Sequence, residues 1–295
     1  MSGTDGPAGL VVVDKPGGMT SHDVVARLRR LAGTRKVGHA GTLDPMATGV
    51  LLVGVNRATR LLGHLTLTEK AYDATVRLGL ATTTDDAEGE PLPTPPATAV
   101  TEQALRDAAA ELVGDIEQVP SSVSAIKVDG RRSYARVRAG EDVALAARPV
   151  TVHALTVHAV RPVEDGMLDA DVSVRCSSGT YVRALARDLG RALGTGGHLT
   201  ALRRTAVGPF GLAEAHPLEA LAEDVALVGI DEVARRCFST VDLTEAQARD
   251  VSYGRRLETD LGATGPVAVL APGGEFLALY EQRGPVAVPV AVFTG

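Results

Sequence analysis

The chain has 295 residues, of which 45% are hydrophobic, so it can form one large domain, or a large and a small one, around an apolar core. Its formal net charge of −6 argues by itself against a nucleic-acid partner, and no apolar run is long enough to cross a membrane. The N-terminus lacks the features of a signal peptide, and the two cysteines lie far apart, as in a reduced compartment. We therefore expect a cytoplasmic protein without a disulfide framework.

The positive charges are concentrated in two segments. Residues 10–63 contain eight Lys and Arg against three Asp, and residues 171–211 contain six Arg against two Asp, whereas residues 212–260 are rich in Asp and Glu. A basic face on an acidic protein can bind a polyanion, because the local field governs contact. Solvated faces that never converge explain the pattern equally well, so charge alone leaves both interpretations open.

The first elements in chain order are a short apolar strand and a helix. Residues 10–18 form an apolar run that ends in Pro-Gly-Gly, which predicts a buried strand and a turn. Residues 20–23, TSHD, have the form of a capping box, and the helix that follows presents a basic outer face. Further along, alternation predicts strands at 70–80 and 168–176, and helical spacing predicts helices at 101–113 and 180–193, with a Pro-rich loop at 87–99.

The sequence changes character after about residue 236. A predicted helix at 244–253 is followed by two apolar segments around APGGE, a sequence typical of a hairpin turn. We therefore expect a domain at 1–236 and a small, mostly-β domain at 237–295. Strands and helices do not alternate in strict βαβ order, which favours an α+β fold.

Motifs for bound cofactors are absent from the sequence. It contains no P-loop, no GxGxxG and no CxxC, and its seven His do not form a metal motif, so we expect no cofactor and no metal. One carboxylate is conspicuous instead: Asp44 lies in the small and apolar segment GHAGTLDPMATGVL, residues 38–51. A structural turn at Asp-Pro and a reactive carboxylate both explain this position.

Several longer segments carry a family resemblance. DKPGGMTSHDVV and RKVGHAGTLDPMATGVL closely resemble the N-terminal motifs of the TruB family of tRNA pseudouridine synthases. KAYDATVRLGLATTTDDAEG, VPSSVSAIKVDGRRSYARVRAGE, VRCSSGTYVRALARDLG and GGHLTALRRTAVGPF resemble its later motifs in matching order, so that the resemblance covers most of residues 10–211. It implies a pseudouridine synthase fold, which is a mixed, mainly antiparallel sheet flanked by helices, with an RNA-binding insertion at about 120–150.

The resemblance also implies the reaction. It is the cofactor-free isomerisation of the T-loop uridine at tRNA position 55, on a base flipped out of the loop, with Asp44 as the nucleophile. Whether Asp44 attacks the base or the sugar stays open. A carboxylate in an apolar loop needs a cation to stay ionised, and the resemblance supplies Arg183, oriented by Asp86. Tyr72 resembles the catalytic tyrosine that stacks on the target base and is a candidate for the base in the last deprotonation.

Other residues match substrate-binding positions of the family or are candidates for phosphate contacts. His39 resembles a histidine that fills the space left by the flipped nucleotide, and Tyr181 and Leu202 resemble residues of the uridine pocket. The candidates for phosphate contacts are Lys15, Lys127, Arg131 and Arg132.

Two alternatives to a tRNA-modifying enzyme remain. The chain could be an RNA-binding or RNA-folding protein on the same scaffold, or a pseudouridine synthase for another RNA. Residues 237–295 are expected to be a PUA-like or divergent RNA-binding domain. The tRNA T stem-loop is the expected partner. A monomer is expected because the sequence shows no exposed apolar stripe that would bind another chain.

Overall fold

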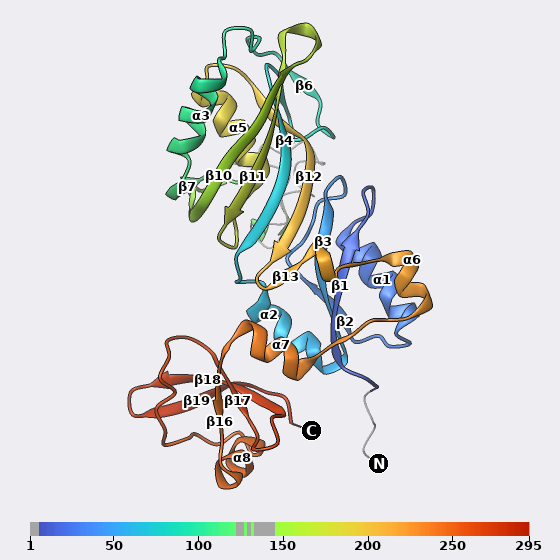
Figure 1. The fold of residues 1–295 in the computed structure, drawn as a ribbon, viewed down its shortest axis with the longest axis vertical. Helices are drawn as coiled ribbons and strands as arrows, with labels where there is room; N and C mark the ends of the chain where they lie inside the picture. Colours follow the sequence, from blue (N-terminus) through green and yellow to red (C-terminus); the bar gives the residue numbers. More distant parts are fainter. Residues whose placement is uncertain (1–5, 122–126, 129–130, 133–144, 295) are drawn as a thin grey trace.

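The computed structural model describes residues 6–121, 127–128, 131–132 and 145–294 (Figure 1). These residues form a large mixed sheet, a four-stranded C-terminal sheet and two small two-stranded sheets. Helices flank the sheets, so the expected α+β class with a small C-terminal sheet is confirmed. None of the helices in this described part of the chain is long and apolar enough to cross a membrane.

The large sheet has the strand order β14-β1-β3-β12-β4-β11-β10-β7, with β2, β13 and β15 paired beside it. Its strands are β1 (Gly9–Lys15), β2 (Val37–Ala40), β3 (Thr48–Val55), β4 (Lys70–Leu78), β7 (Gly114–Gln118), β10 (Arg148–Pro162), β11 (Leu168–Cys176), β12 (Gly197–Val207), β13 (Phe210–Gly211), β14 (His216–Pro217) and β15 (Val228–Gly229). Along the main path, β1 pairs with β14 and β3 with β12 in parallel, and the other neighbours are antiparallel. The sheet is therefore mainly antiparallel, as expected.

The helices are α1 (Ser21–Leu31), α2 (Leu62–Leu65), α3 (Glu102–Glu111), α5 (Val182–Ala192), α6 (Leu218–Glu223), α7 (Ile230–Cys237) and α8 (Glu245–Ser252), with 3₁₀ turns η1 (Asn56–Leu61), η2 (Glu164–Gly166) and η3 (Leu212–Glu214). Four of the helices, α1, α3, α5 and α8, correspond to helices predicted from the sequence, whereas α2, α6 and α7 were not predicted. The predicted capping box is present at the start of α1, where Thr20 and Asp23 exchange hydrogen bonds. Helices α3 and α5 lie together behind β4, β10, β11 and β12 (Figure 1).

The alternation of β4 determines which side chains reach the core. Tyr72, Ala74 and Val76 are buried toward the helices, whereas Asp73 is exposed on the opposite face of the sheet. In the register with β12, Tyr72 lies opposite Arg204. This pairing brings an aromatic ring and a guanidinium together at the centre of the sheet.

Two glycines allow close backbone contacts around β12. A Cβ on Gly49, whose φ is +97°, would lie 2.2 Å from the backbone oxygen of Arg204, where β3 meets β12. A Cβ on Gly190 of α5 would lie 2.4 Å from the backbone nitrogen of Gly197, at the start of β12. A side chain at either position would push these elements apart.

The four-stranded sheet lies at the C-terminal end of the chain and has the order β16-β17-β18-β19 (Figure 1). Its strands are β16 (Ser239–Asp242), β17 (Val267–Leu270), β18 (Phe276–Arg283) and β19 (Val286–Val292), and the expected hairpin at APGGE joins β17 to β18. Phe276, Leu279 and Phe293 share an apolar cluster with Leu10 and Leu52 of the large sheet. The domain boundary between residues 236 and 237 stays a prediction.

The two small sheets each consist of one pair of short strands. Strands β5 (Ala81–Thr82) and β6 (Pro91–Leu92) pair with each other, so the segment expected to be a Pro-rich loop contains a short strand. Strands β8 (Lys127–Val128) and β9 (Arg131–Arg132) pair within the expected insertion.

Candidate active site

The loop that carries Asp44 runs between β2 and β3, and hydrogen bonds to its backbone hold it in place. The Ser21 hydroxyl donates to the Leu43 carbonyl at 3.1 Å and accepts from the Leu43 amide at 2.9 Å. Leu43 and Ala47 are buried on either side of Asp44, and the Ala47 amide donates to the Asp44 carbonyl at 3.1 Å. The two apolar side chains therefore fix the loop in the core, while the Asp44 side chain stays 36% exposed.

Lys15 also holds the loop that carries Asp44. Its side chain is fully buried, and Nζ donates to the carbonyls of Pro16, Met19 and Pro45 at 2.9, 2.7 and 3.2 Å. Burial lowers the pKa of Lys15 to about 8, although the nearby Asp44 opposes this change. The prediction of a phosphate contact by Lys15 is corrected here, because its ammonium group is enclosed by protein carbonyls.

Arg183 lies between two carboxylates, as the resemblance implies. Its Nε is 3.0 Å from Asp44 Oδ2 and its Nη1 is 3.2 Å from Asp86 Oδ2, and its side chain is only 4% exposed. Nη1 also donates to the Thr84 carbonyl at 2.9 Å. The other oxygen of Asp86 accepts from the Thr84 hydroxyl at 2.5 Å and from the Glu88 amide at 3.1 Å. The guanidinium is thus fixed from the turn after β5.

The electrostatic environment of Asp44 combines opposing effects. Burial raises the pKa of Asp44, whereas Arg183 lowers it, Asp86 raises it and Lys15 lowers it. Removal of either cation would therefore favour the neutral acid. The balance of these effects is a raised pKa for Asp44, and the two cations limit the rise.

Tyr72 faces this loop from β4 and is buried. Burial raises the pKa of its hydroxyl, and the Arg204 guanidinium, which hydrogen bonds to that hydroxyl, opposes the change. Arg204 is itself 1% exposed and donates from Nε to the Val50 carbonyl at 2.7 Å and from Nη2 to the Gly41 carbonyl at 2.9 Å. It therefore joins the aromatic ring to the start of the Asp44 loop.

Three buried polar residues of this site were not among the sequence candidates. They are Arg204, Lys70 and Gln118. Lys70 donates to the carbonyls of Thr66 and Thr68, and burial lowers its pKa to about 8. Gln118 accepts from the Tyr181 amide at 2.8 Å and donates to the Tyr181 carbonyl at 3.2 Å. Strand alternation could have indicated two of them, because Lys70 shares a face with Tyr72 and Arg204 with Leu202.

These groups surround a cavity of about 280 Å³. Its lining includes Asp44, Tyr72, Arg183 and the two expected pocket residues Tyr181 and Leu202. Such a volume lies near the low end of the roughly 300–1,000 Å³ typical of small-molecule sites, which suits one nucleobase better than several nucleotides.

Of the remaining candidates, His39 is not among the residues that line this cavity. His39, on β2, is half-buried with its ring 5.4 Å from that of His22. Lys127, Arg131 and Arg132 belong to the paired strands β8 and β9, and their side chains lie outside the described part of the structure. Across the residues that are described, no group of three or more His, Cys, Asp or Glu is placed to hold a metal ion.

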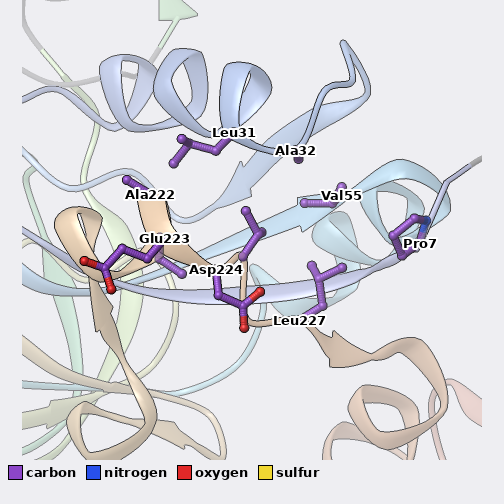
Figure 2. Close-up of a pocket in the computed structure, with 10 residues that line it drawn as sticks. Pro7, Leu31, Ala32, Val55, Ala222, Glu223, Asp224 and Leu227 are labelled. Atoms are coloured by element: carbon purple, nitrogen blue, oxygen red, sulfur yellow. The ribbon is translucent and has the colours of Figure 1, made fainter.

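A second cavity, of about 360 Å³, lies at the end of α1 near α6. Leu31, Val55 and Leu227 line it together with the acidic residues Glu223 and Asp224 (Figure 2). None of its lining residues is a candidate from the sequence. The cavity beside Asp44 is therefore the one that gathers the predicted catalytic groups.

Three family models together match residues 29–294. Residues 29–182 match the model of the TruB family pseudouridylate synthase N-terminal domain. Residues 183–243 match the tRNA pseudouridylate synthase B C-terminal domain, and residues 238–294 match the tRNA pseudouridine synthase II C-terminal model.

Curated relatives are similar over almost the full chain. A tRNA pseudouridine synthase B of Arthrobacter sp. (strain FB24) is 60% identical over 97% of this chain and 96% of its own length. That of Thermobifida fusca (strain YX) is 57% identical over 97% of this chain and 99% of its own length.

Solved structures share the fold. The chain of a Cbf5-Nop10-Gar1 complex matches with a TM-score of 0.73 at 26% identity, covering 97% of this chain and 85% of that one. An H/ACA RNP bound to a substrate RNA containing 2′-deoxyuridine gives the same TM-score at 24% identity, with the same coverage. Motifs, fold and relatives agree, and the chain belongs to the TruB family of pseudouridylate synthases.

Proposed function

We propose that this protein isomerises the T-loop uridine at position 55 of tRNA to pseudouridine, with Asp44 as the nucleophile and without a cofactor. The observation that carries the proposal is the contact of Arg183 with Asp44 at 3.0 Å and with Asp86 at 3.2 Å, beside Tyr72 in one cavity. The names of the curated relatives support tRNA as the substrate class.

The chemistry balances within the nucleoside. The bond between N1 of uracil and C1′ of ribose breaks, the base turns, and C5 bonds to C1′ while C5 loses a proton and N1 gains one. Asp44 acts as the nucleophile that bonds to the detached part, and this bond breaks again when C5 bonds to C1′, so that the carboxylate is regenerated. Arg183 favours the ionised carboxylate for this step. Because the exchange involves no net redox change, it needs no electron donor or acceptor.

Tyr72 is proposed to stack on the base, with Leu202 and Tyr181 on the remaining walls. The phenol stays protonated at neutral pH, since burial raises its pKa. A base inside a folded loop must be extruded to reach Asp44, and extrusion costs a few kcal/mol of stacking. His39 is proposed to occupy the vacated space, and Lys127, Arg131 and Arg132 are proposed to contact phosphates.

The test is pseudouridine formation on an unmodified tRNA transcript, with the modified position mapped. Wild type is expected to modify the T-loop uridine, whereas Asp44→Asn is expected to bind the transcript with similar affinity and form no product. Asp73→Asn is the matched control, because Asp73 is exposed on the opposite face of the same sheet and should retain activity.

Two results would contradict the proposal. Loss of tRNA binding together with activity in Asp44→Asn would make Asp44 a structural residue of the loop. A wild-type protein that binds the transcript without modifying it would favour an RNA-folding role or another RNA substrate. Monomeric state and cytoplasmic location stay predictions.

A further inference from the structure

The turn between β5 and β6 carries two adjacent carboxylates that face successive turns of α5. Asp86 lies 3.2 Å from Arg183, and Asp85 Oδ2 lies 3.1 Å from Arg187 Nη1. Arg183 and Arg187 are four residues apart, so their side chains leave the same side of the helix. The proposed reaction uses Asp86 and Arg183 but gives no role to Asp85 and Arg187.

The backbone of Asp85 is in an unusual conformation. Its φ of +59° lies in the left-handed region, which is strained for most residues and better tolerated by Asp, Asn and Gly. The Leu199 amide of β12 donates to the Asp85 carbonyl at 3.1 Å, and Asp86 forms a parallel bridge with Leu199. The turn is therefore docked on the large sheet next to the cavity.

The Asp85 side chain has a second partner on another segment. The Ser121 hydroxyl donates to Asp85 Oδ2 at 2.6 Å, and both residues are buried. Arg187 Nη2 donates to the Val119 carbonyl at 2.7 Å. One buried carboxylate thus connects the turn, α5 and residues 119–121.

The same segment also contacts the start of α5. Gln118 exchanges hydrogen bonds with the backbone of Tyr181, so residues 118–121 contact the chain both before and after Arg183. Burial raises the pKa of Asp85, while Ser121 and Arg187 oppose the change. Arg187 also pairs with Asp188 at 2.9 Å, so loss of the Asp85 carboxylate would remove one of its two anionic partners and would free the turn that carries Asp86.

We propose that Asp85 is a positioning residue for this reaction. Together with Arg187 and Ser121 it fixes the turn that holds Asp86, and through Asp86 it keeps Arg183 against Asp44. The proposal rests on the proposed function. It differs from a purely structural role, because a structural role would change the amount of folded protein and not the rate of the folded fraction.

The first experiment compares Asp85→Asn with Asp165→Asn. Both replacements suit a left-handed backbone, and Asp165, whose φ is +60°, is exposed on η2. With enzyme in excess over a tRNA transcript, Asp85→Asn should lower the single-turnover rate by about tenfold or more, with tRNA affinity within about twofold of wild type. Asp165→Asn should match wild type.

Two further variants test the connection. Ser121→Ala keeps the charge pair and removes one hydrogen bond, so a smaller loss of rate is expected than for Asp85→Asn. The double variant Asp85→Asn/Arg187→Met should be less impaired than the product of the two single losses, because both remove the same pair. Multiplicative losses would contradict a shared function.

A readout without substrate separates this proposal from the proposed function. The Nε–H proton of Arg183 faces Asp44, and its NMR resonance, assigned by its loss in Arg183→Lys, should move in Asp85→Asn but not in Asp165→Asn. An unmoved resonance with a wild-type single-turnover rate would overturn the positioning role. A moved resonance in a protein whose wild type forms no pseudouridine would support the positioning role and refute the proposed function.

Discussion

Replacement of Arg183 by Met should impair the reaction far more than RNA binding. The guanidinium is buried, with 4% of its side chain exposed, and it contacts Asp44 and Asp86 directly. In Arg183→Met both carboxylates lose their shared cation. Asp44 would then bind a proton more readily, because burial and the negative charge of Asp86 both act in that direction.

The magnitude follows from the geometry. Two unit charges about 4 Å apart interact by about 4 kcal/mol at an effective dielectric constant of about 20. Because the Asp44 side chain is 36% exposed, solvent screening leaves roughly half of this, about 2 kcal/mol. If the charged carboxylate is required in the transition state, this corresponds to a loss in kcat of about 30-fold.

The assay is the pH dependence of single-turnover pseudouridine formation, measured beside tRNA affinity. The acid limb of the profile should move to higher pH in Arg183→Met, since a carboxylate with a raised pKa ionises only at higher pH. Arg191→Met is the control, because Arg191 is exposed on the same helix and should leave the acid limb in place. Equal losses of affinity and rate with an unmoved acid limb would identify Arg183 as a phosphate contact and refute the reasoning.

Two further predictions concern stability. Burial lowers the pKa of Lys70 to about 8 from 10.5, so the unfolded chain binds more protons than the folded one between these pH values. The free energy of unfolding of wild type should therefore rise by about 2 kcal/mol relative to that of Lys70→Met as the pH rises from 8 to 10. Urea titrations across this range would measure the difference, and a constant difference would show that Lys70 is not desolvated. Gly49→Ala should destabilise the fold by more than about 3 kcal/mol in the same assay, because its Cβ would lie 2.2 Å from the Arg204 carbonyl oxygen. Gly18→Ala, at φ +79° with no neighbour within 4 Å, should lose only about 1 kcal/mol, and equal losses would show that backbone strain alone matters at Gly49.

Local patterns predicted the elements that carry the site. The alternation of β4 placed Tyr72 on a buried face, and the capping box located α1 within one residue of its start. The predicted helix at 180–193 carries Arg183 and Arg187 four residues apart, and each meets one carboxylate of the same turn. These features depend on short-range geometry, which the sequence records directly.

Partners distant in the sequence could not be predicted in this way. Lys15 and Arg204 are long cations that normally remain in solvent, so the sequence gives no sign that backbone carbonyls enclose them. Arg203 and Arg204 are adjacent on β12 but face opposite ways, and Arg203 pairs with Asp14 at 2.7 Å. Strand alternation separates the faces of the two arginines, but only the order of the strands in the sheet brings the carbonyls of Val50 and Gly41 to Arg204.

The apolar cluster that joins the two sheets has a consequence for substrate choice. Leu10 and Leu52 of the large sheet pack in this cluster with Phe276, Leu279 and Phe293. The C-terminal sheet therefore packs directly against the large sheet and is not merely connected to it by a linker. This packing sets the distance and angle between the cavity beside Asp44 and the outer surface of the C-terminal sheet in the structure. For any RNA that contacts both surfaces, the length and bend of the molecule become selectable properties, alongside the sequence of the loop that enters the cavity.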